Sequence, residues 1–148
     1  MTPPYIDLIL LCYGKFATTT KPCLDSLLAD CINANFRLTV VDNGSSDNSA
    51  NELREYLKPY PQVRAQYLKE NIGYSGGMNY GVSFAEGEWL LLISNDTIFS
   101  PGALFSLYNS LREQPADVGL VAPITNAAGN GQGYTIRGNA SEVLEHLF

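Results

Sequence analysis

Four polar or glycine-rich segments of this chain each follow an apolar run and contain the residue types from which a ligand site can be built. They are Cys12 to Lys15, Asp42 to Asp47, Lys69 to Asn79 and Ser94 to Thr97. Carboxylates can accept hydrogen bonds or hold a hard cation, and glycine-rich backbone can approach a ligand closely. We therefore expect the four segments to converge on one binding site.

The second segment begins with Asp42, which follows the apolar run Phe36 to Val41. A carboxylate at this position can accept a hydrogen bond from the imide N–H of a pyrimidine base. Asn43, Gly44 and Ser45 favour a tight turn. For these three residues we prefer the plainer interpretation, an Asx-turn that caps the next helix.

The third segment is unusually rich in glycine, with four glycines in the eleven residues 71–81. Exposed N–H groups here, or at the start of the following helix, can hold an anion. The alternative is an irregular helix entry whose small residues pack beneath a sheet. Its position after an apolar strand, rather than the glycines alone, favours a ligand site.

The fourth segment places Asp96 after the most apolar run of the chain, Glu88 to Ser94. A carboxylate there suits Mg²⁺ or Mn²⁺ shared with diphosphate oxygens. Such a cation would stabilise a leaving diphosphate as a Lewis acid. The alternative is that Asp96 caps the turn into the next helix, near Thr97 and Ser100.

Alternating strands and helices must position these segments. Apolar strands between amphipathic helices favour an α/β fold, with a mainly parallel sheet and helices on both faces. Ligands bind such sheets beyond the carboxyl ends of the strands. The expected strands are 5–12, 36–41, 63–68, 88–94 and 118–122. The expected helices are 18–34, 46–57, one entered through a loop over 73–85, one from Ser100 to Pro115, and one starting over 141–148.

The first helix should have one apolar face. Leu24, Leu27, Leu28 and Cys31 recur at the spacing of one helical side. Thr20 is a suitable N-cap residue because its hydroxyl can accept a backbone hydrogen bond.

Composition bounds the class of protein. The 148 residues fit a single domain, 1–148, and the net charge is -6. Nine scattered Lys and Arg residues form no basic stripe, which argues against binding nucleic acid. Three cysteines without a CxxC pair, and one histidine, argue against zinc and favour reduced thiols in a cytoplasm. We see no signal peptide, and the apolar runs are too short to span a membrane.

Two common nucleotide motifs are absent. A dinucleotide fold needs GxGxxG after the first strand, where this chain has only Gly14, and no P-loop sequence occurs. A nucleotidyltransferase would need a basic glycine-rich loop at the same place, and Gly14-Lys15-Phe16 is too short for one.

In their order and spacing, the four segments resemble the family 2 glycosyltransferases with a GT-A fold. That family has an apolar strand with a polar end, then a Val-Asp-(Asn/Asp)-Gly-Ser-x-Asp turn. An Asn-x-Gly-x-(Ser/Ala)-Gly-(Gly/Ala)-x-Asn-x-Gly segment and a hydrophobic strand ending in a DXD motif follow. Val118 to Asn126 also resembles the next strand and loop of rhamnosyltransferase-like members, so the resemblance covers about residues 5–126. It implies a GT-A-like, that is Rossmann-like, fold.

The resemblance implies a nucleotide-sugar site. Asp42 would bind a uracil or thymine ring, with Cys12 and Tyr13 beside the base. Cys12 stands where threonine is more usual in the family, which removes a good hydroxyl donor.

On the diphosphate side, the resemblance implies that Asp96 carries Mg²⁺ or Mn²⁺. Ser94 replaces the outer acid of the DXD motif, so Asp96 is the motif's one carboxylate. The remaining residues expected to line the nucleotide sugar are Asn71, Gly76, Asn79 and Asn95.

The implied reaction is inverting transfer of a sugar from a UDP- or dTDP-sugar to a saccharide or lipid-linked acceptor, in bacterial cell-surface polysaccharide synthesis. The catalytic base is unknown and expected beyond Phe148, so we expect a domain truncated at its C-terminus. The expected location is the cytoplasm, with peripheral attachment at the inner membrane face left open. The alternative is a catalytically incompetent nucleotide-sugar-binding or scaffold module with the same fold.

Overall fold

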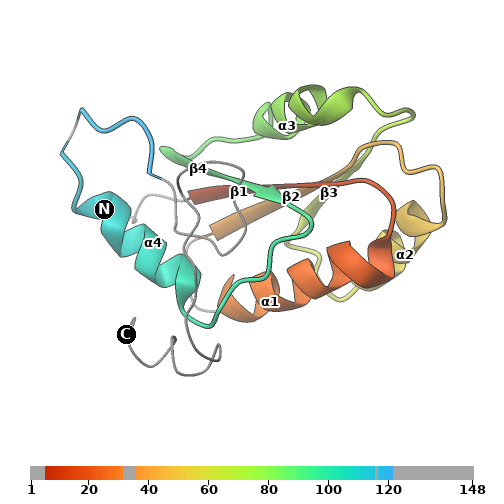
Figure 1. The fold of residues 1–148 in the computed structure, drawn as a ribbon, viewed down its shortest axis with the longest axis horizontal. Helices are drawn as coiled ribbons and strands as arrows, with labels where there is room; N and C mark the ends of the chain where they lie inside the picture. The colour runs from red at the N-terminus through yellow and green to blue at the C-terminus, as the bar shows by residue number, and fades with distance from the viewer. Residues whose placement is uncertain (1–5, 32–35, 116, 122–148) are drawn as a thin grey trace, which may run out of the picture. The chain divides into compact units, whose positions relative to one another are not determined.

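The computed structural model describes residues 6–31, 36–115 and 117–121 (Figure 1). The chain divides into two compact units, Met1–Phe105 and Ser106–Phe148. The first unit contains the sheet and all the residues of the expected site. No helix in the described ranges is both long enough and apolar enough to cross a lipid bilayer.

The sheet of the first unit has four described strands, all parallel, in the order β3-β2-β1-β4. Every residue of β1 is buried, as are the last five of β2, whereas β3 and β4 at the edges are only partly buried. This confirms the prediction of a mainly parallel α/β sheet built on apolar strands. The strands are β1 (Ile6–Cys12), β2 (Phe36–Asp42), β3 (Arg64–Tyr67) and β4 (Trp89–Ser94).

The strand order creates a topological switch point beside β1. The chain runs outward from β1 to β2 and β3, and then returns to place β4 on the other side of β1. The strand order therefore reverses between β1 and β4, and an open α/β sheet forms a crevice at the carboxyl ends of its strands where such a reversal occurs. Ligands of open α/β sheets bind in this crevice.

Helices cover both faces of the sheet, as predicted. Figure 1 shows α1 and α2 on one face and α3 on the other. A π-helical turn, η1, leads directly into α1. The last helix, α4, begins in the first unit and ends in the second. The bounds are η1 (Phe16–Thr20), α1 (Lys21–Cys31), α2 (Ser49–Leu57), α3 (Gly73–Val82) and α4 (Ala103–Arg112).

The core on the α1 side follows the predicted helical face. Leu24 and Leu27 are fully buried, and Leu28 is partly buried. Leu8 and Leu10 of β1 are fully buried as well, and the alternation of a strand turns them away from the α3 side. The side chain of Cys31, the last residue predicted for this face, lies outside the described residues.

On the other face, α3 packs very close to the sheet. A Cβ atom at Gly81 would lie 2.4 Å from Cγ2 of Ile9 and 3.1 Å from Cγ2 of Val41, so only glycine permits this approach. The sequence left open whether the glycines of this segment bind a ligand or pack beneath the sheet. For Gly81 the packing interpretation is confirmed.

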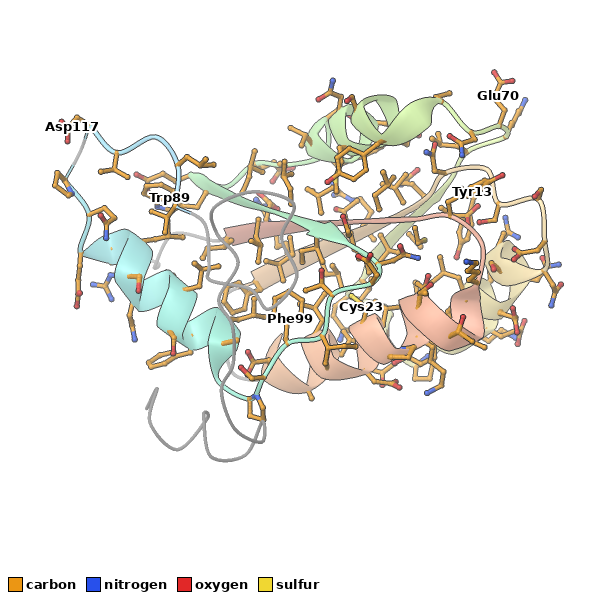
Figure 2. The ribbon with its side chains drawn as sticks, in the orientation of Figure 1. Tyr13, Cys23, Glu70, Trp89, Phe99 and Asp117 are labelled. Carbon is orange, nitrogen blue, oxygen red and sulfur yellow. The ribbon has the colours of Figure 1, made fainter. Side chains whose placement is uncertain are left out.

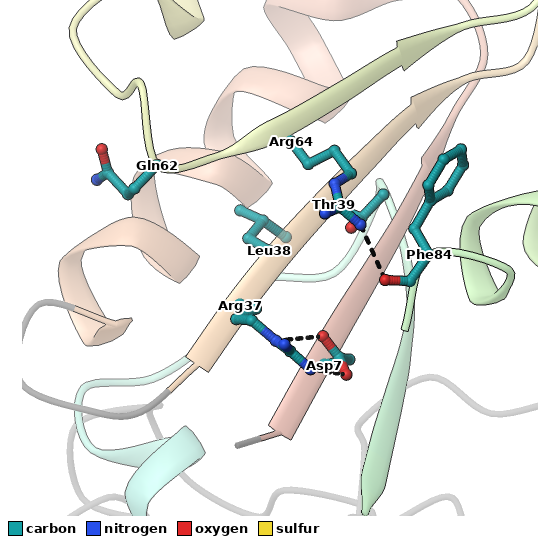
Figure 3. Close-up of a pocket in the computed structure, with 7 residues that line it drawn as sticks. All are labelled: Asp7, Arg37, Leu38, Thr39, Gln62, Arg64 and Phe84. Atoms are coloured by element: carbon teal, nitrogen blue, oxygen red, sulfur yellow. Dashed lines mark hydrogen bonds and ion pairs between the residues drawn. The ribbon is translucent and has the colours of Figure 1, made fainter. Parts of the chain in front are cut away.

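The amino end of the sheet is closed by an ion pair (Figure 3). Asp7, buried in β1, accepts hydrogen bonds from Nε and Nη2 of Arg37, at 2.9 and 2.8 Å. It also accepts from the N–H groups of Glu86 and Gly87, just before β4. Burial by itself would raise the pKa of the Asp7 carboxyl, but the bonds from Arg37, Gly87 and Glu86 outweigh it and hold that pKa below its usual 3.8.

Two local predictions are wrong. Thr20 does not cap the first helix: it is the last residue of η1, which begins after Lys15 in the left-handed conformation (φ 52°). Residues 118–121 form no strand, and the Val118 N–H donates to the Pro115 carbonyl, which closes a turn at the start of this run. Ala122 and the helix expected over 141–148 lie outside the described residues.

Candidate functional site

A cavity of about 290 Å³ lies at the carboxyl ends of the strands, where the switch point places it. All four segments named from the sequence contribute to it, so their convergence is as expected. Its size is at the lower limit of small-molecule sites. The lining residues are Leu11, Cys12, Tyr13, Asn43, Asn71, Tyr74, Ser94, Asn95 and Asp96.

Five of the eight predicted site residues line this cavity. They are Cys12, Tyr13, Asn71, Asn95 and Asp96. The other three predicted residues are near lining residues in the sequence, but they do not themselves appear among the described lining residues. These are Asp42, Gly76 and Asn79.

The Asp42 carboxylate is held beneath the turn that follows β2. The side chain is 2% exposed, and its Oδ2 accepts from the Ser45 N–H at 3.1 Å. Its Oδ1 accepts from the Ser45 hydroxyl, which in turn accepts from the Gly14 N–H at 2.8 Å. The predicted turn is thus confirmed for Ser45, but the predicted cap is not: α2 begins at Ser49, and its N-cap residue is Asn48. A base could reach Asp42 only by sharing an oxygen that is already bonded.

Alternate residues after β2 fix the loop after β1. The side chains of Ser45, Asp47 and Ser49 accept hydrogen bonds from the three consecutive N–H groups of residues 14–16, at 2.8, 3.0 and 3.0 Å. This loop follows Tyr13 directly. We call these three hydrogen bonds the clip. The clip holds Tyr13, which is 48% exposed, at the rim of the cavity.

Asn43 joins the ends of β2 and β3, a role that the sequence did not reveal. Its side chain is buried, and its Nδ2 donates to Asn71 Oδ1 and to the Gly73 carbonyl, both at 3.1 Å. Its Oδ1 accepts from the Ile72 N–H at 3.2 Å. Asn43 therefore fixes the loop that carries Asn71 into the cavity.

Tyr74 is a second residue that the sequence analysis missed. It lines the cavity and is 59% exposed, so its ring is available to a ligand. The sequence feature that could have identified Tyr74 is an aromatic residue inside a glycine-rich segment, at a position that no apolar periodicity assigns to the core. With Tyr13, it gives the rim two aromatic surfaces, which suit stacking against a planar base.

Asp96 stands just beyond the end of β4, exposed to solvent. Among the described residues, none forms a hydrogen bond or ion pair with its carboxylate. The described part of the chain also has no cluster of three or more His, Cys, Asp or Glu side chains that could hold a metal ion. The hard oxygen donors nearby, in Asp96, Asn95 and Ser94, fit Mg²⁺ or Mn²⁺ when a substrate supplies the remaining ligands.

The two described cysteines are buried free thiols. Burial raises the pKa of Cys12 to about 12, and it raises that of Cys23 to about 12 as well. Both stay protonated near neutral pH and are poor nucleophiles. Cys12 thus contributes shape to the cavity wall, while Cys23 points from α1 toward the sheet (Figure 2).

Comparisons with known proteins agree on one family. The profile described as "Glycosyl transferase family 2" matches residues 7–142. The minor teichoic acid biosynthesis protein GgaB of Bacillus subtilis is 32% identical over 96 residues, which is 64% of this chain and 11% of GgaB. The poly(ribitol-phosphate) beta-glucosyltransferase of Bacillus spizizenii is 31% identical over 100 residues, 66% of this chain and 16% of that protein.

Solved structures share the fold. S. aureus TarS 1-349 superposes with a TM-score of 0.63 at 22% identity, over 73% of this chain and 32% of TarS. The mannosyltransferase PcManGT from Pyrobaculum calidifontis, in complex with GDP-Man and Mn²⁺, superposes with a TM-score of 0.64 at 19% identity. That match covers 76% of this chain and 33% of PcManGT. The chain thus spans about a third or less of these proteins.

Proposed function

Because this chain belongs to glycosyl transferase family 2, we propose that its cavity binds the nucleoside-diphosphate sugar donor of a glycosyltransferase. The donor is a UDP- or dTDP-sugar. The acceptor is a saccharide or a lipid-linked saccharide of a bacterial cell-surface polysaccharide, and transfer inverts the anomeric centre. The teichoic acid protein among the relatives supports the pathway class.

The observation that carries this proposal is the exposed Asp96 carboxylate at the rim of the switch-point cavity. Tyr13 lies at the end of β1, before the loop that the clip holds, and Tyr74 contributes a second aromatic ring to the rim. We assign the base to these rings, with Cys12 beside it. We assign the diphosphate to Asn71, Asn95 and the loop that carries Gly76 and Asn79.

Mg²⁺ or Mn²⁺ at Asp96 would neutralise charge on the leaving diphosphate. Asn95 and Ser94 would present their oxygens to the same region. Asp42 would act on the base through an oxygen that it also shares with Ser45. We assign no catalytic base, because Asp96 is the single carboxylate among the described lining residues.

The cytoplasm is the location that fits this proposal, with contact at the inner membrane face when the acceptor is lipid-linked. The buried free thiols Cys12 and Cys23 support a reducing compartment. A nucleotide-sugar-binding module without catalytic activity is the second candidate, because the described cavity supplies binding groups and a single carboxylate, Asp96. We expect this chain to bind the donor but to transfer sugar slowly, since a general base contributes about 10² to 10⁴ in rate.

The decisive experiment compares wild type with Asp96→Asn by calorimetric titration. UDP, dTDP, GDP and uridine are titrated with and without Mn²⁺. In wild type, Mn²⁺ should strengthen diphosphate binding, and in Asp96→Asn that gain should fall at least about tenfold, because a charged metal ligand is lost. Uridine binding should stay unchanged.

Asp25→Asn is the charge-matched control, because Asp25 is exposed on α1 and is not among the lining residues. It should leave every titration as in wild type. An Asp96→Asn variant with unchanged metal dependence would show that Asp96 only caps a turn. Binding of GDP in preference to UDP and dTDP would show that the assignment of a pyrimidine base is wrong.

A further inference from the structure

The backbone after β4 is attached to one side of the η1–α1 helix. Cys23 Sγ lies 3.9 Å from the Ser94 carbonyl, and Ser26 Oγ accepts from the Phe99 N–H at 3.1 Å. Asp30 accepts from the N–H groups of Gly102 and Leu104, at 2.6 and 2.8 Å. Residues 20, 23, 26 and 30 recur at the spacing of one helical side. A single row of side chains therefore contacts the segment that follows β4.

Thr19 and Thr20 begin this row and reach the turn that carries Asp96. The Asn95 Nδ2 donates to the Thr20 hydroxyl at 2.8 Å and to the Thr19 hydroxyl at 3.1 Å. A primary amide has two N–H groups, so both are used. The rotation of the Asn95 side chain is therefore fixed by the threonine pair.

The same pair is itself held in place. The Thr19 hydroxyl donates to the Lys15 carbonyl at 2.9 Å. Thr20 is 1% exposed, and its side chain is close enough to the Cys12 thiol to affect the pKa of that thiol. A continuous chain of contacts thus runs from Cys12 at the end of β1, through Thr20, to Asn95 at the end of β4.

We propose that Thr19 and Thr20 are positioning residues for the donor diphosphate, because they hold the Asn95-Asp96 turn in the orientation that a bridging cation requires. This inference rests on the proposed function. Neither threonine lines the cavity, so both act through Asn95.

The contacts of the turn explain why this pair matters. Residues 94 and 97 are joined by one backbone hydrogen bond, from the Thr97 N–H to the Ser94 carbonyl at 3.2 Å. Within the described residues, the two hydrogen bonds of the Asn95 amide are the only side-chain hydrogen bonds from residues 95 and 96 to the rest of the unit. Without the Asn95 hydrogen bonds, the Asp96 carboxylate would sample more orientations. The free energy of cation binding would then be less favourable, because binding would have to order this side chain. The nucleoside half, held by the clip after β2, would be unaffected.

The test is the double variant Thr19→Val, Thr20→Val, which keeps the shape of both side chains and removes both hydroxyls. In the presence of Mn²⁺, we expect the Kd for UDP to rise about tenfold, as the loss of two neutral hydrogen bonds implies. The Kd for uridine should change less than twofold.

Two variants serve as controls. Thr20→Ser retains the hydroxyl and should keep wild-type affinity. Thr18→Val removes a hydroxyl from the same turn, where Thr18 donates to the Lys15 carbonyl at 3.4 Å and does not bond to Asn95. It too should bind as wild type does.

A ligand-free measurement separates this inference from the proposed function. NMR relaxation of the Asn95 side-chain amide and the Asp96 backbone amide should show increased motion in the double variant only. If wild type binds UDP with Mn²⁺ and the double variant binds equally well, or loses UDP and uridine in equal proportion, the inference is wrong and the function stands. If wild type binds no nucleotide, the proposed function fails. Unchanged motion in the double variant would then show that the threonines do not hold the turn, while increased motion would retain that role but not a role toward the diphosphate.

Discussion

The two ends of the sheet each present an aspartate beside a strand, and their carboxylates are in opposite situations. At the amino end, Asp7 is buried and accepts hydrogen bonds from Arg37 and from two backbone N–H groups. At the carboxyl end, Asp96 is exposed, and no described residue bonds to its carboxylate. The cavity at the amino end is also smaller, about 80 Å³ against about 290 Å³.

The difference separates a structural carboxylate from one that is available to a ligand. The partners of Asp7 come from β2 and from the connection before β4, so its charge joins three parts of the sheet. The Asp96 carboxylate joins no two parts of the described chain, and the adjacent turn is held by the Asn95 side chain instead. The same substitution at the two positions should therefore affect different properties.

The largest expected effect is on stability, from Asp7→Asn. This change removes the Asp7 charge from its pair with Arg37, which keeps its exposed partner Glu86, and the new amide N–H₂ faces other donors. Removing one member of a buried pair costs about 3 to 5 kcal/mol, and the partial exposure of Arg37 reduces this to about 2 to 4 kcal/mol. Urea unfolding monitored by circular dichroism would measure it.

Asp25→Asn is the matched control for that measurement, because Asp25 forms an exposed pair with Lys21, and the asparagine keeps an oxygen that can accept from the Tyr56 hydroxyl as Asp25 does. Its loss should cost no more than about 1 kcal/mol. Equal losses for Asp7→Asn and Asp25→Asn would mean that the buried network contributes no more than a surface ion pair.

The next effect is the pH dependence of the difference between wild type and Asp7→Asn. The folded pKa of Asp7 is held below 3.8, so the stability that its charge contributes is present above the unfolded pKa. That contribution is lost as pH falls below about 4 and through the lowered folded pKa. The difference in unfolding free energy should thus be constant from pH 7 to about 5 and shrink below pH 4.

Comparing the two proteins cancels the titration of the other carboxylates, which both contain. Unfolding curves at pH 7, 5, 4 and 3 would give the profile. A difference that stays constant down to pH 3 would contradict the lowered pKa.

The smallest expected effect on stability is from Asp96→Asn. Because the carboxylate has no described partner, the free energy of unfolding should change by no more than about 0.5 kcal/mol. Its effect should instead be on metal-dependent nucleotide binding, as proposed above. A loss of stability comparable to that of Asp7→Asn would show that Asp96 has a structural role, and it would remove the contrast between the two ends.

Much of this architecture could be predicted from local patterns. The buried runs of β1 and β2, the apolar face of α1 and the parallel sheet follow from side-chain periodicity, which a chain displays without its partners. The convergence of four segments on one edge follows from the parallel arrangement alone. The run 118–121 shows the limit of such patterns, because a turn from Pro115 occupies the place where a strand was expected.

The sequence by itself determined which residue types gather at the carboxyl end, because strand alternation and chain order decide that. Only the tertiary structure decided what each side chain does there. Asp42 and Asp96 look alike in sequence, each an acid after an apolar strand, yet Asp42 is bonded to Ser45, whereas the Asp96 carboxylate bonds to no residue that the structure describes. The hydrogen-bond partners of Asn43 and Asn95 could not be predicted from the sequence either, since they lie 28 and 75 positions away along the chain. Hydrogen bonds are short-ranged and directional, so a contact between distant segments exists only once packing has brought the two groups within about 3 Å.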